Sequence, residues 1–117
     1  MSSLNYLALS VVLTTCGLAP GEGPKAERGY QRAAPVIEAL QSYHADHGAY
    51  PDSLPQLVPD YLAADALALP EHEQERYPLE YRVEAGIYAL TFRYVGPGVN
   101  ECTFRPDGNG WKCSGYY

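Results

Sequence analysis

The stretch from Val36 to Leu62, VIEALQSYHADHGAYPDSLPQLVPDYL, constrains the fold of this chain more than any other. Apolar residues recur through its first part at helical spacing, and the pattern stops at Gly48. A glycine just past the last periodic residue is typical of a helix C-terminus, because glycine adopts the left-handed conformation without steric cost. The sequence therefore predicts an amphipathic helix followed by a turn through Tyr50 and Pro51.

We expect this helix to span residues 31–47 and to bury one stripe. The stripe falls at i, i+4, i+7 and i+11 and consists of Ala33, Ile37, Leu40 and His44, widened by Val36 and Tyr43. The residues off the stripe, which should face water, are Glu38, Gln41, Ser42 and Asp46. Pro35 fits an early helical position, where no backbone donor is needed, or a kink if the helix begins near Ala26.

A short helical turn is expected after the Tyr50-Pro51 turn. Leu54, Leu57 and Val58 provide its apolar side, and either Ser53 or Asp52 can cap it.

The helix and the turn together resemble the signature of type II secretion pseudopilins, especially the major pseudopilin. The residues that carry the resemblance are Leu40, Tyr43, Asp46, Gly48, Tyr50, Pro51, Leu54 and Leu57. The resemblance implies a globular α+β head that contacts other proteins of a secretion or pilus-like apparatus. It does not extend to the N-terminus, where the long apolar helix of that family has no counterpart. The calcium loop of the major pseudopilin also has no counterpart here beyond Asp107.

The N-terminus has the pattern of an export signal. Leu4 to Thr15 is an apolar stretch of the length of a signal-peptide core, too short to span a bilayer. It ends in Leu-Thr-Thr-Cys16, which resembles the bacterial lipobox; the alternative is a buried helix with a free cysteine. We therefore predict a signal peptide over residues 1–15, lipidation of Cys16, a flexible tether over residues 16–29 and one domain over residues 30–117. Gly17 after the cysteine suggests the outer membrane, by resemblance to sorted lipoproteins.

Alternating apolar residues predict a small antiparallel sheet of two hairpins behind the helix. In the first hairpin, a two-residue turn at Ala85-Gly86 pairs Val83 with Tyr88, Tyr81 with Leu90 and Leu79 with Phe92. A three-residue turn would place the two apolar sets on opposite faces, so the even register is favoured. The predicted fold class is thus α+β, with one N-terminal amphipathic helix packed on the sheet.

The last hairpin leads to a disulfide prediction. An even loop centred on Asp107-Gly108 sets Cys102 opposite Cys113 and Phe104 opposite Trp111, whereas a bulge at Gly108 would offset the cysteines. Directly opposed cysteines are near enough to bridge. Three cysteines in an exported chain leave one odd thiol, and lipidation of Cys16 accounts for it.

Composition and motifs argue for binding rather than catalysis. A net charge of −6 without clustered Lys and Arg disfavours nucleic acid. His44 and His47 have metal-ligand spacing but no evident third ligand, and no nucleophile motif, phosphate loop, cofactor site or small-molecule substrate is indicated. The acidic segment 69–78 is expected to be a solvated loop, and Tyr94, Tyr116 and Tyr117 are candidates for a contact surface.

Two classes of function follow from the sequence. The first is a non-enzymatic, lipid-anchored envelope protein that binds a protein partner of a secretion or pilus-like machinery. The second is an inhibitor or immunity-type periplasmic lipoprotein that binds a basic partner through an acidic, tyrosine-rich surface.

Overall fold

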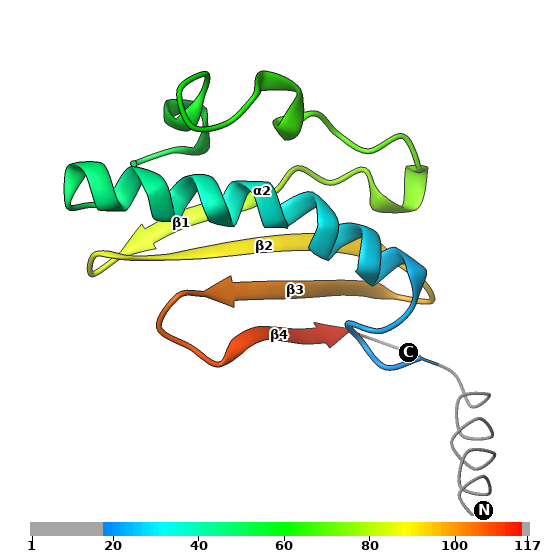
Figure 1. Ribbon diagram of the computed structural model, residues 1–117. Helices are drawn as coiled ribbons and strands as arrows, with labels where there is room; N and C mark the ends of the chain where they lie inside the picture. The colour runs from blue at the N-terminus through cyan, green and yellow to red at the C-terminus, as the bar shows by residue number, and fades with distance from the viewer. Residues whose placement is uncertain (1–17, 116–117) are drawn as a thin grey trace, which may run out of the picture.

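A computed structural model describes residues 18–115 of the chain. The predicted signal peptide, Cys16, Tyr116 and Tyr117 lie outside the described residues. The described part is an α+β structure in which one long helix crosses one face of an antiparallel sheet (Figure 1). Its elements are α2 (Pro24–His47), the short 3-10 helices η2 (Leu54–Leu57), η3 (Ala64–Leu67) and η4 (Glu73–Glu75), and the strands β1 (Glu80–Glu84), β2 (Ile87–Val95), β3 (Val99–Arg105) and β4 (Gly110–Gly115).

The sheet is a single four-stranded meander in the order β1-β2-β3-β4. The predicted register is confirmed at both ends: Val83 pairs with Tyr88 across the Ala85-Gly86 turn, and Cys102 pairs with Cys113. β2 also pairs with β3, which joins the first and last strand pairs into one sheet. The expected pair of Leu79 with Phe92 falls outside the ladder, because β1 begins at Glu80.

Helix α2 begins at Pro24, seven residues before the expected start and close to the alternative start near Ala26, so residues 24–29 are helical rather than part of a tether. Pro24 occupies the first turn, where its missing N–H costs nothing. Gly29 lies so close to the Phe92 ring that a side chain would overlap it, which shows that this part of the helix packs on the sheet. Pro35 is therefore inside the helix. Both Pro35 and Gln31 are exposed, so water can reach the carbonyl left without a helical partner.

The helix stripe and the inner face of the sheet form the core. Ala33, Val36 and Leu40 are fully buried, as predicted. They belong to the main cluster with Leu54, Leu57, Leu62, Tyr88 and Leu90, whereas Ala26, Phe92, Tyr94 and Cys102 form a second cluster towards the start of the helix. His44 is exposed, contrary to the prediction, because the packed part of the helix ends before its last turn.

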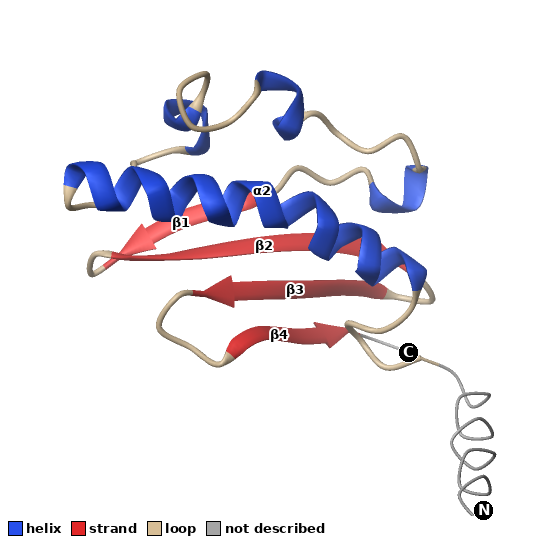
Figure 2. Ribbon diagram, in the orientation of Figure 1, coloured by secondary structure: helices blue, strands red, loops and turns tan. Residues whose placement is uncertain are grey.

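The segment between α2 and β1 runs beside the helix, on its side away from β3 and β4 (Figure 2). It contains η2, η3 and η4, and η2 begins after Ser53, one of the two caps considered. Gln56 Oε1 accepts hydrogen bonds from the backbone N–H groups of Asp52 (2.6 Å) and Ser53 (3.4 Å). This arrangement supports the turn that the sequence predicted over Leu54 and Leu57.

Candidate functional site

The eight residues that carry the family resemblance lie in the second half of α2, in the turn that follows it and in η2. We call this region, residues 40–57, the joint. Gly48 caps the helix in the left-handed conformation (φ 76°), and its N–H donates to the His44 carbonyl at 2.8 Å. Pro51, three residues further along the chain, is buried. The side chains of Leu40, Leu54 and Leu57 are buried, whereas Tyr43, Asp46 and Tyr50 lie at the surface of the joint. The motif therefore fixes how the chain leaves the helix.

Two tyrosine hydroxyl groups hold this joint together. Tyr61 donates to Asp46 Oδ2 at 2.7 Å, and Tyr81 donates to the Pro51 carbonyl at 2.7 Å. The hydrogen bond to Asp46 raises the pKa of Tyr61 to about 12. Burial raises the pKa of Tyr81 to about 12. Both hydroxyl groups therefore stay protonated near neutral pH and act as donors.

Five aromatic side chains, Tyr43, His44, His47, Tyr50 and Tyr61, make up a surface that we call the aromatic end. Tyr43 stacks on His47 with ring centroids 4.0 Å apart and meets Tyr61 edge to face at 5.4 Å. His44 lies over Tyr50 with centroids 4.3 Å apart. The two histidines are exposed and the three tyrosines are partly exposed. Their rings are thus ordered by one another and remain accessible.

His44 and His47 have the spacing of metal ligands, but their rings take part in other contacts. His47 Nδ1 lies 3.0 Å from the Tyr43 carbonyl, and both histidine rings are engaged with tyrosine rings. Within residues 18–115 no group of three His, Cys, Asp or Glu side chains is placed to hold a metal ion. Rather than converging on a common point, the two histidines lie in separate aromatic pairs.

The surroundings of the aromatic end are acidic. Residues 38–60, which contain these rings except that of Tyr61, include four Asp and Glu residues and neither Lys nor Arg. Asp46, Asp52 and Asp60 are the exposed acidic residues nearest to the aromatic rings in the chain. At neutral pH the aromatic end therefore combines accessible aromatic rings with negative charge.

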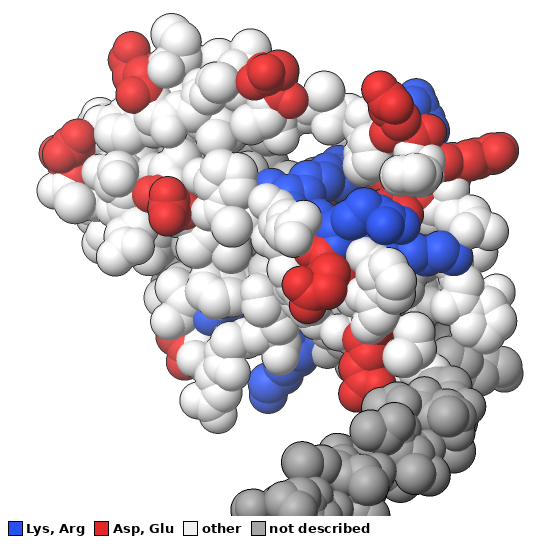
Figure 3. Space-filling model, turned by 45° about the vertical axis from the view of Figure 1, so that its right-hand side comes forward, with Lys and Arg blue, Asp and Glu red and all other residues white. Residues whose placement is uncertain are grey.

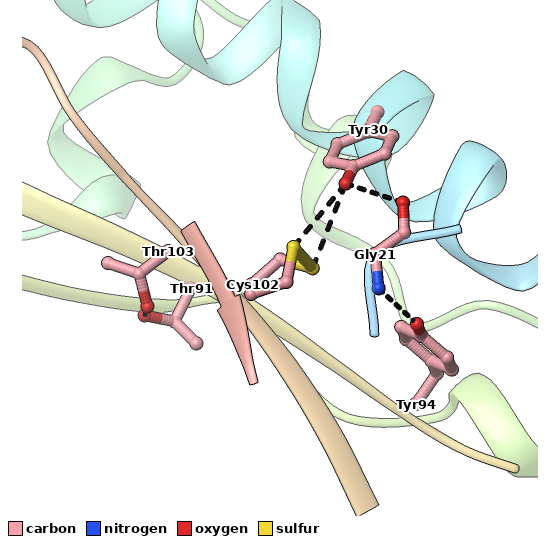
Figure 4. The surroundings of a disulfide bond; sticks show 7 residues. Gly21, Tyr30, Thr91, Tyr94, Cys102 and Thr103 are labelled. Carbon is pink, nitrogen blue, oxygen red and sulfur yellow. Dashed lines mark hydrogen bonds between the residues drawn. A yellow bond between two sulfur atoms is a disulfide. The ribbon is translucent and has the colours of Figure 1, made fainter. Parts of the chain in front are cut away.

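The Cys102–Cys113 disulfide is present, as predicted, and lies at the other end of the helix (Figure 4). Tyr30 reaches it from α2: the Tyr30 hydroxyl is 3.4 Å from Cys113 Sγ and donates to the Gly21 carbonyl at 2.9 Å. The Gly21 N–H donates to the Tyr94 hydroxyl at 2.9 Å. The chain that enters α2 is thus tied to the disulfide-bonded end of the sheet.

Tyr94 was a candidate for a contact surface in the sequence analysis, but the structure places Tyr94 in the core. Its side chain is only 4% exposed, because it extends from β2 towards α2. Its hydroxyl oxygen accepts a hydrogen bond from the Gly21 N–H. Burial also raises the pKa of Tyr30, which stays a donor.

The acidic segment 69–78 is not simply a solvated loop. Glu75 is only 6% exposed, and its carboxylate accepts two hydrogen bonds from Arg28, at 2.9 Å from Nε and 2.6 Å from Nη2. These hydrogen bonds hold the pKa of Glu75 below its usual value. A buried carboxylate needs such a partner, and the sequence did not reveal it because Arg28 was assigned to a tether.

A cluster of positive charge was also missed in the sequence analysis, because the helix was expected to begin at residue 31. Lys25, Arg28 and Arg32 fall at i, i+3 and i+7, so they share one face of α2 near its beginning. Figure 3 shows Lys and Arg side chains gathered around a hollow on this side of an otherwise acidic protein. Helical spacing in the sequence would have indicated this cluster if the helix had been begun at Pro24.

Comparisons with protein-family models, with curated proteins and with solved structures gave no match to this chain. Within residues 18–115, none of the helices combines the length and the apolar composition needed to cross a membrane.

Proposed function

We propose that this chain is a non-enzymatic, lipid-anchored protein of the bacterial envelope. Its α+β domain, which resembles a pseudopilin head, serves as a protein-binding or structural module of a type II secretion or pilus-like machinery. In this proposal Cys16 carries the lipid, and the domain faces the periplasm from the outer membrane.

The observation that carries the proposal is the aromatic end. Aromatic side chains are enriched in protein interfaces, where tyrosine buries a large ring while its hydroxyl keeps a hydrogen bond. Here the rings of Tyr43, Tyr50 and Tyr61 are already ordered by neighbouring rings and by the bond to Asp46. A partner that binds them therefore loses little side-chain entropy on association.

The position of this surface suits an anchored protein. Helix α2 has 24 residues, which corresponds to a length of about 36 Å at 1.5 Å per residue. The aromatic end lies at its C-terminal end, whereas a lipid on Cys16 would hold the chain on the N-terminal side. The anchor would thus leave the aromatic end free for a partner. The disulfide is compatible with the oxidising periplasm.

The acidic surroundings of the aromatic end favour a second candidate function, that of a periplasmic inhibitor or immunity-type lipoprotein. Acidic residues around accessible tyrosines complement a basic enzyme or toxin and speed its association. The two functions share the binding surface and differ in the partner.

Site-specific photocrosslinking in cells distinguishes these proposals. A photoreactive amino acid at Ala45, which is exposed between the two histidines, should yield a crosslinked partner, whereas the same residue at Lys112 on the opposite face of the sheet should not. A secretion or pilus component supports the first function, and a hydrolase or toxin supports the second. Equal crosslinking at Ala45 and Lys112, or none at Ala45, would contradict an interface at the aromatic end.

The anchor is tested separately by metabolic labelling with a palmitate analogue. The wild-type protein should take up the label and remain in the membrane fraction, whereas Cys16→Ser should do neither. Label retained by Cys16→Ser would rule out lipidation at this cysteine.

A further inference from the structure

A second candidate site lies at the opposite end of the helix from the aromatic end. A cavity of about 300 Å³ opens between the first half of α2, β2 and the segment that carries η3 and η4. This volume is at the lower end of the range of small-molecule sites. Its walls are partly apolar, formed by Pro35, Ala66, Ala68, Pro70 and Phe92.

The charged groups around this cavity are unequally satisfied. Arg28 forms a salt bridge with Glu75, and the Lys25 ammonium group donates to the Val95 carbonyl at 2.6 Å. Arg93 forms salt bridges with Glu80 and Glu101 on the other face of the sheet. Arg32 is the exception. Its Nε and Nη2 atoms are buried and have no hydrogen-bond partner within residues 18–115.

Arg28 shows what these two atoms are suited to bind. It holds the two oxygens of Glu75 with its own Nε and Nη2, the planar fork that matches a carboxylate. One helical turn further along, Arg32 presents the same fork without a carboxylate. Burial lowers the pKa of Arg32, because a desolvated guanidinium lacks compensation. The Arg32 Nε and Nη2 atoms make no hydrogen bond within the described residues, so the guanidinium group can turn into the cavity without breaking one.

We propose that this cavity binds a small monocarboxylate with a compact apolar body. In this arrangement the Arg32 fork holds the carboxylate, and the apolar walls around Ala66 and Phe92 cover the body of the ligand. An inorganic anion would leave these walls uncovered, and a neutral ligand would leave the fork unpaired. The carboxylate also adds negative charge to a lining in which Lys and Arg side chains outnumber Asp and Glu, namely Lys25, Arg28, Arg32 and Arg93 against Asp65 and Glu75.

Isothermal titration of the full chain in detergent tests the proposal with three probes: benzoate, its neutral isostere benzamide, and inorganic phosphate. Hydrogen bonds to a charged group are strong, so benzoate should bind at least about tenfold more tightly than benzamide. Benzoate should also bind more tightly than phosphate, which lacks an apolar body. Equal affinity for benzoate and benzamide, tighter binding of phosphate, or no saturable binding of benzoate would overturn the proposal.

Two matched variants locate the site. Arg32→Gln should weaken benzoate binding at least about tenfold, whereas Arg82→Gln, which removes an exposed charge on β1, should leave it unchanged. Ala68→Leu, which narrows the cavity without touching Arg32, should also weaken binding, and it keeps the test valid if Arg32→Gln does not fold. Benzoate binding unaffected by Arg32→Gln or Ala68→Leu would place the ligand elsewhere.

Discussion

Replacing Gly29 with alanine should destabilise the protein, although the same change in most helices stabilises it. Glycine in a helix interior costs about 1 kcal/mol relative to alanine. An added methyl group, however, would lie 2.5 Å from Cζ of Phe92 and still nearer to Cε1 and Cδ1. Carbon atoms normally approach to about 3.5–4.0 Å, so either the ring or the helix must move.

The Phe92 ring has little room to move. It is 1% exposed, and the rings of Tyr30 and Trp111 enclose it at centroid distances of 5.3 and 5.2 Å. Overpacking of a core costs typically about 1–3 kcal/mol, and this enclosed position belongs in the upper half of that range. After the gain in helix propensity is subtracted, we expect Gly29→Ala to lower the free energy of unfolding by about 1–2 kcal/mol. The midpoint of thermal unfolding should fall by about 5–10 °C.

Chemical and thermal denaturation followed by circular dichroism measures this difference. Ala34→Gly, at an exposed position of the same helix, reports the propensity effect alone and should cost about 1 kcal/mol. In a Phe92→Leu background the smaller side chain relieves the overlap, so Gly29→Ala should become neutral or stabilising. If Gly29→Ala stabilises the wild-type protein, the helix does not pack on Phe92 as described.

Three further predictions concern the other contacts. Replacing both Cys102 and Cys113 with alanine should lower the free energy of unfolding by about 3 kcal/mol, from the loop that a separation of 11 residues closes; an unchanged denaturation midpoint would refute it. Glu75→Gln should lower the melting temperature at neutral pH. Its arginine partner keeps the folded-state pKa of Glu75 low, so the carboxylate's stabilisation is present above its unfolded pKa of about 4.3 and is lost as the pH falls through the folded value. The melting difference should therefore shrink in acid, and a constant difference would count against it. Asp46→Asn should move the pKa of Tyr61 from about 12 towards its usual value of 10.0, as measured by NMR titration, and no change would show that the hydrogen bond does not form.

Much of the candidate site was predictable because its residues are close in the sequence. The joint at the end of α2 depends on Gly48, Pro51 and a leucine pair, and each acts through local backbone geometry or helical spacing. The pairing of Cys102 with Cys113 likewise follows from the parity of one short loop. Periodicity and turn chemistry record such relations directly.

Contacts between distant segments were not predictable in this way. Glu75 and Arg28 are 47 residues apart, and Gly21 and Tyr94 are 73 apart. No local pattern relates the members of these pairs. The helix start was misplaced for the same reason, since residues 24–29 have weak periodicity and their packing on the sheet is what makes them helical.

The sequence by itself determined the α+β class, the end of α2 at Gly48, the registers of the two predicted hairpins and the disulfide, because these depend on neighbours along the chain or across one turn. Only the tertiary structure decided where α2 begins, that Glu75 and Tyr94 are buried, and that Nε and Nη2 of Arg32 have no hydrogen-bond partner among residues 18–115. Burial and charge pairing depend on which surfaces come into contact when α2, the sheet and the segment between α2 and β1 pack together. These contacts are set by the packing of the whole chain rather than by any local pattern of residues.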